Sequence, residues 1–69
     1  IPYRLAEAGE IEITVYDLSG RHIRTLYHGY QSAGEHQIRF DAGYLGSGVY
    51  ICRLRAGELI LTRKMTLLK

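Results

Sequence analysis

Apolar and polar side chains alternate with a period of two along most of this chain, and clusters of turn residues interrupt the alternation. The clearest run covers residues 11–16, in which Ile11, Ile13 and Val15 are the inward set. This period places apolar side chains on one face of a β-strand, and no run has the period of a helix. The pattern predicts an all-β fold, a small antiparallel immunoglobulin-like β-sandwich of six to seven strands. A small open barrel is the alternative.

Turn residues mark where the predicted strands end. Residues 17–20 and 56–58 predict tight turns, because Asp and Ser bond to nearby backbone groups and Gly accepts a positive φ. Residues 31–34 predict another hairpin, which would lead into a strand over residues 36–40. A further strand over residues 49–55 follows a glycine-rich loop.

Residues 21–30 keep the alternation imperfectly. Ile23 and Leu26 are three positions apart, so a strand can bury both side chains only if it contains an extra residue. The spacing predicts a β-bulge near Arg24 and Thr25. A helix is the alternative, but the β-branched and aromatic residues of this segment favour a strand.

Length and composition exclude several classes of protein. The 69 residues fit one domain, and a net charge of +2 is too weak to predict a nucleic-acid-binding surface. Cys52 is the one cysteine, so no disulfide forms within the chain. Cys52 alternates with Tyr50 and Leu54, which predicts a small buried hydrophobe, with a reactive thiol as the alternative.

Neither a signal peptide nor a membrane-spanning run is evident, and Ile1 already lies in a predicted strand. We therefore expect residues 1–69 to form a single C-terminal domain that is a fragment of a larger protein.

Residues that could carry chemistry are present, but their spacing does not indicate a catalytic, cofactor or metal site. His28 and His36 flank the predicted 31–34 hairpin, yet no acidic or cysteine ligand follows them at the spacing of a zinc or calcium site. Asp17 and Asp41 lie at strand ends, where we expect them to cap turns. We therefore expect no catalytic residue, cofactor or metal.

Two groups of surface residues leave a binding role open. Tyr27, Tyr30 and Tyr44 could form an aromatic strip that stacks on sugars, as in an accessory carbohydrate-binding module of a secreted hydrolase. A basic group late in the chain is expected to form a solvated face that discourages edge pairing, with a recognition surface as the alternative. Its members are Arg53, Arg55, Arg63, Lys64 and Lys69.

Six blocks of sequence occur in a fixed order. They are IPYRL at 1–5, AG at 8–9, VYDLSGR at 15–21, AGEH at 33–36, Leu45 with SGVY at 47–50, and TRKMTLLK at 62–69. In order and spacing they resemble the C-terminal sorting domains of the type IX secretion system. Those domains are similar to the immunoglobulin-like domain of the flagellar hook-capping protein. The resemblance covers nearly the whole chain, although the Asn-Pro-rich segment that usually precedes the first strand is absent.

The resemblance implies a non-enzymatic sorting signal at the C-terminus of a secreted or cell-surface protein of Bacteroidetes-like bacteria. Its implied partners are the outer-membrane translocation machinery, which reads the folded domain, and the upstream cargo domain of the same polypeptide. A sortase-type protease commonly removes such a domain. A structural module that associates weakly with itself through sheet edges is another alternative, and no nucleic-acid partner is expected. Carried over by position, the implied recognition residues are Asp17, Gly20, Arg21, Gly48, Val49, Tyr50, Lys64 and Lys69.

Overall fold

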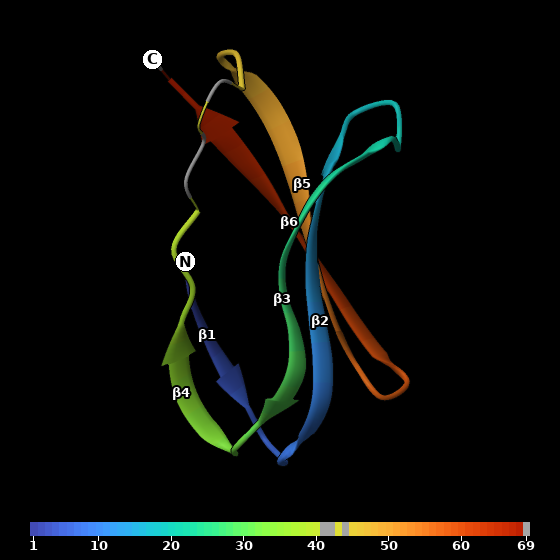
Figure 1. Cartoon of the computed structure of the whole chain (residues 1–69), viewed down its shortest axis with the longest axis vertical. Coiled ribbons are helices and arrows are strands. Elements are labelled where there is room, and N and C mark those ends of the chain that lie inside the picture. Colours follow the sequence, from blue (N-terminus) through green and yellow to red (C-terminus); the bar gives the residue numbers. More distant parts are fainter. Residues whose placement is uncertain (41–42, 44, 69) are drawn as a thin grey trace.

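The computed structural model describes residues 1–40, 43 and 45–68, which form two antiparallel sheets and no helix (Figure 1). The strands are β1 (Pro2–Leu5), β2 (Gly9–Asp17), β3 (His22–Gln31), β4 (Gly34–Gln37), β5 (Gly48–Ala56) and β6 (Leu59–Leu67). β1 pairs with β4, and the larger sheet has the order β3-β2-β5-β6. The predicted all-β sandwich is confirmed, and no ladder between described strands closes the two sheets into a barrel.

The central strand β2 supplies most of the core. Ile11, Ile13 and Val15 are only 3%, 2% and 0% exposed, as their alternation predicts. Leu5 of β1 and Cys52 of β5 are buried beside Ile11 and Ile13, so the core lies between the two sheets. A domain of this size buries a modest share of its surface, and each of these side chains therefore matters to stability.

Two of the three predicted hairpins are present. β2 and β3 are joined by the turn that follows Asp17, and β5 and β6 are joined by a turn at Gly57, whose φ is 63°. The third prediction was wrong, because residues 31–34 connect two different sheets and β4 pairs with β1. The predicted strand over residues 36–40 is also displaced, since β4 ends at Gln37.

The small sheet joins segments that are far apart in the sequence. Tyr3 lies opposite His36, and the two rings stack with centroids 5.5 Å apart. Ile1 and Ile38 exchange two backbone hydrogen bonds, of 2.8 and 2.9 Å. Nothing in the local pattern of either segment specifies this pairing.

The irregular segment predicted around Arg24 and Thr25 is confirmed, with a shift of register on each side of that pair. Pairing passes from Tyr27 to Thr25 across one shift and from Arg24 to His22 across the other. Each extra residue rotates the following side chains to the other face. As a result the adjacent residues Leu26 and Tyr27 both pack against the core.

Among the residues that the structure describes, no helix is long and apolar enough to cross a membrane.

Candidate recognition site

The three segments predicted to carry recognition meet at one end of the larger sheet. Asp17 of β2 lies opposite Tyr50 of β5, and Tyr50 lies opposite Met65 of β6. Figure 1 shows the turn after β2, the start of β5 and the end of β6 at the same end of the molecule. We call residues 17–21, 48–50 and 65–68 the recognition end.

The Asp17 carboxylate holds the turn of the recognition end. Its Oδ1 accepts hydrogen bonds from the Ser19 N–H at 3.0 Å, the Ser19 hydroxyl at 2.6 Å and the Arg21 N–H at 2.9 Å. The Gly20 N–H donates to the Asp17 carbonyl at 3.0 Å, and Gly20 has a φ of 90°, which favours glycine. The predicted turn-capping role of Asp17 is therefore confirmed.

The same contacts set the charge of the turn. The Ser19 hydroxyl, followed by the Arg21 N–H, holds the pKa of Asp17 below its ordinary value. The Arg21 Nε donates to Asp17 Oδ2 at 3.2 Å, while the Arg21 side chain stays 78% exposed. The turn thus presents a fixed carboxylate together with an accessible guanidinium.

The start of β5 contributes a side chain that ties down the preceding loop. The Tyr50 hydroxyl donates to the Gly46 carbonyl at 2.8 Å. Gly48 and Val49 lie opposite Leu67 and Thr66, so this block is in direct register with the end of β6. Gly48, Val49 and Tyr50 therefore lie at the same end of the sheet as the turn after β2, and their role in recognition stays a prediction.

The basic residues late in the chain do not form a single face. Arg63 lies opposite Cys52 and so shares the core-facing side of the sheet, whereas Lys64 lies opposite Ile51 on the outer side with Arg53. Lys64 is exposed and lies one residue before the recognition end. Lys69 lies outside the described residues. The predicted single basic face was therefore wrong, because neighbouring residues of a strand point to opposite faces.

An aromatic and basic cluster on the outer face lies directly behind the turn. The Arg53 guanidinium carbon is 4.9 Å from the centroid of the Tyr16 ring, and the His22 ring meets Tyr16 edge-on at 6.0 Å. Two residues further along β5, Arg55 forms an ion pair with Glu12 of β2 at 3.4 Å. Sequence reasoning missed this cluster, because it depends on the register that places Arg53 beside β2.

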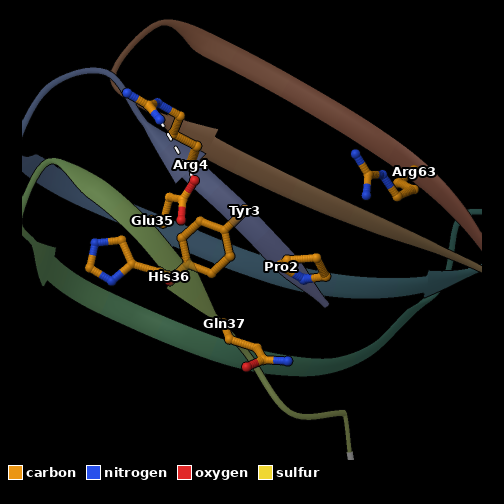
Figure 2. A pocket seen from close by; sticks show the side chains of 7 residues that line it. All are labelled: Pro2, Tyr3, Arg4, Glu35, His36, Gln37 and Arg63. Carbon is orange, nitrogen blue, oxygen red and sulfur yellow. Dashed lines mark ion pairs between the residues drawn. The ribbon is translucent and has the colours of Figure 1, made fainter.

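A wide groove of about 630 Å³ lies over the small sheet, with Arg63 of β6 at its side (Figure 2). Figure 2 shows Arg4 and Glu35 side by side, and their ion pair measures 3.7 Å between highly exposed side chains. His36 stacks on Tyr3, and its Nε2 lies 2.7 Å from the Ser32 carbonyl. These polar groups are paired in contacts that stabilise the strands and do not form a nucleophile–base arrangement.

The remaining candidate sites are not assembled in the structure. His28 and His36 lie on strands of different sheets, and no group of three metal-ligating side chains gathers among the described residues. Tyr27 packs against the core and donates its hydroxyl hydrogen to the Tyr30 carbonyl at 2.6 Å, so it does not extend an exposed strip. Tyr44 lies outside the described residues.

Cys52 behaves as a structural residue. It is 7% exposed and contacts the core, as the alternation of β5 predicts. Burial raises the pKa of its thiol, and a protonated thiol is a weak nucleophile. The interpretation of Cys52 as a small buried hydrophobe is confirmed.

The fold and this surface define a small β-sandwich module whose distinctive residues gather at one end of a sheet. A family model, the secretion system C-terminal sorting domain, matches residues 2–67, and the chain belongs to this family. Domains of the family are the C-terminal sorting signals of type IX secretion and are generally non-catalytic. No curated protein and no solved structure matches the chain.

Membership of the family confirms the resemblance inferred from the six sequence blocks. The domain marks a larger cargo polypeptide for export through the outer membrane, either to the cell surface or into the medium. The similarity to the hook-capping protein stays a prediction.

Proposed function

We propose that the translocation machinery binds the recognition end of the folded domain, and that the chain is a sorting signal without enzymatic activity of its own. In this proposal residues 1–69 form one domain at the C-terminus of the cargo polypeptide. Its accessible contacts come from a surface that exists only after folding, because the contributing segments are distant in sequence.

The observation that carries the proposal is the register Asp17–Tyr50–Met65 across three neighbouring strands. It brings three of the family-like sequence blocks together on one end of a sheet. Local hydrogen bonds then hold the turn in one conformation, which lowers the entropy lost when a receptor binds it.

The residues of the recognition end fall into two roles. Asp17, Gly20, Gly48 and Tyr50 shape the backbone and hold it in place. Arg21 and Val49 offer side chains to the receptor, and Lys64, one residue before the recognition end, and Lys69 are proposed as further basic contacts. Leu18 adds an apolar side chain that is 68% exposed at the tip of the turn.

Export of a reporter tests this proposal. A reporter fused before residue 1 is expressed in a bacterium with type IX secretion, and the exported fraction is compared for Arg21→Glu and Glu58→Lys. Both residues are exposed charges in turns, but Glu58 lies at the opposite end of the sheet. We expect Arg21→Glu to reduce export and Glu58→Lys to leave it unchanged, with both domains equally stable in urea. Equal export of the two variants would contradict the proposal.

A further inference from the structure

β6 (Leu59–Leu67) forms one edge of the larger sheet, and its outer edge is nine residues long with no shift of register and no proline. None of its nine residues is fully buried, and Leu59, Ile60 and Leu61 are 56%, 53% and 51% exposed. An unpaired strand edge presents a row of N–H and C=O groups that another strand can bond to.

The other sheet edges carry features that hinder such pairing. β3 has two shifts of register, which twist and interrupt its edge. β4 is only four residues long. On β1, the reciprocal bonds between Ile1 and Ile38 leave Pro2 with its ring nitrogen on the free side, where it has no hydrogen to donate. Among the described strands, β6 is therefore the edge best suited to accept a partner strand.

Register identifies the backbone groups that face the free side of β6. The turn at Gly57 closes with Ala56 opposite Leu59, and a two-residue hairpin is closed by a hydrogen-bonded pair. Alternate residues from Leu59 onward then bond to β5. The N–H and C=O groups of the intervening residues point away from the sheet, and these residues are Ile60, Thr62, Lys64 and Thr66.

The side chains of β6 indicate the charge of the partner. Residues 59–67 contain no carboxylate, and Arg63 and Lys64 place one positive charge on each face of the strand. Neither forms an ion pair with another described residue. A second copy that paired symmetrically about Arg63 or Lys64 would set like charges directly opposite each other, which is unfavourable.

We infer that the free edge of β6 binds an extended strand of a partner protein that carries adjacent acidic residues. The partner's carboxylates lie opposite Arg63 and Lys64, and its apolar side chains lie opposite Ile60 and Leu61. Backbone bonds to the edge supply the register, and the two ion pairs select the partner. The edge shares Thr66 with the recognition end and Lys64 with the proposed receptor contacts, but it does not include the turn at residues 17–21. Binding of a partner strand to the isolated chain can therefore be tested without the translocation machinery.

Hydrogen exchange on the 69-residue chain tests the inference with two synthetic peptides. Both consist of alternating valine and threonine, and one has two adjacent glutamates near its centre where the other has two lysines. We expect the glutamate peptide to slow exchange of the four edge amides, at Ile60, Thr62, Lys64 and Thr66, by at least about tenfold. We expect the lysine peptide to leave them unchanged, and added salt to weaken the glutamate complex.

Variants of β6 separate backbone pairing from charge. Thr62→Pro removes an N–H that faces the free side, while Thr62→Val keeps it, so we expect only the proline variant to lose peptide binding. Arg63→Glu combined with Lys64→Glu should exchange the preference for the two peptides, a result that stands even if the proline variant does not fold. Equal binding of both peptides would overturn the inference. So would binding without slower exchange of the edge amides, or a dimer that protects them in the absence of peptide.

Discussion

Asp17 lies directly opposite Tyr50 across β2 and β5, so the turn after β2 begins beside the start of β5. The two blocks are more than thirty residues apart in the sequence. Because Asp17 and Tyr50 lie side by side, the two sequence blocks of the family pattern form one continuous surface in the folded domain. The turn itself is organised by one carboxylate, and its behaviour with pH provides a first prediction.

Stability at low pH depends on the charge of Asp17. Its pKa is held below the ordinary value of 3.8, so the charged form favours the folded state. This stabilisation is present above the unfolded-state pKa and is lost as the pH falls through the lower folded-state value. We expect wild type to lose more stability than Asp17→Asn between about pH 5 and about pH 3, measured by urea unfolding. An equal loss in both proteins would contradict this role.

Loss of one methyl group from the core should be felt strongly in so small a domain. Ile13 is 2% exposed, and we expect Ile13→Val to lower the free energy of unfolding by about 0.5–1.5 kcal/mol. Ile60 is 53% exposed and provides the matched control, because Ile60→Val makes the same chemical change with an expected effect below about 0.5 kcal/mol. Similar losses in urea unfolding would show that the core is placed wrongly.

The turn between β5 and β6 requires a left-handed residue. Gly57 has a φ of 63°, and a side chain in this region costs about 1 kcal/mol, so Gly57→Ala should destabilise the domain by that amount. Gly46 has no such φ and open space around its Cα, which makes Gly46→Ala the control. Thermal unfolding of the two variants measures the difference, and an equal fall of the melting temperature in Gly57→Ala and Gly46→Ala would contradict the hairpin geometry.

Cys52 should react slowly with alkylating reagents in the folded chain. Its burial raises the thiol pKa and limits access, so we expect iodoacetamide to modify it at least about tenfold more slowly than in the urea-unfolded chain. Mass spectrometry of the labelled fraction over time gives both rates. Equal rates would favour the alternative of an accessible, reactive thiol.

Local patterns were enough to predict the elements whose neighbours in sequence are also neighbours in space. The alternation of Ile11, Ile13 and Val15 identified the buried face of β2, and the turn residues identified its hairpin with β3. The spacing of Ile23 and Leu26 predicted the irregular segment at the right place in β3. The side chains of β3 that pack against the core are, however, Leu26 and Tyr27.

Pairing between distant segments could not be predicted in the same way. Residues 31–34 have the composition of a hairpin loop, but the strand after them pairs with β1 and not with β3. Both pairings satisfy the local alternation, and the choice between them is decided by packing of the whole core. The aromatic strip left open for Tyr27 is not formed for a related reason, since Tyr27 lies opposite Ile13 and packs against the core.

The candidate site was predictable as a set of blocks but not as a surface. The resemblance indicated Asp17, Tyr50 and Lys64 individually, while their relative positions follow from the register of three strands. The prediction of a single basic face failed for a similar reason, because Arg63 and Lys64 are adjacent in sequence but lie on opposite faces of β6.

Site-specific photo-crosslinking in cells tests most directly whether the recognition end is what the machinery contacts. A photoreactive amino acid replaces either Leu18, which is 68% exposed at the recognition end, or Glu58, which is exposed at the opposite end of the sheet. The cargo is expressed in a bacterium with type IX secretion and irradiated during export. We expect crosslinks from position 18 to an outer-membrane component and none from position 58. Crosslinks from position 58 alone would contradict the proposed site.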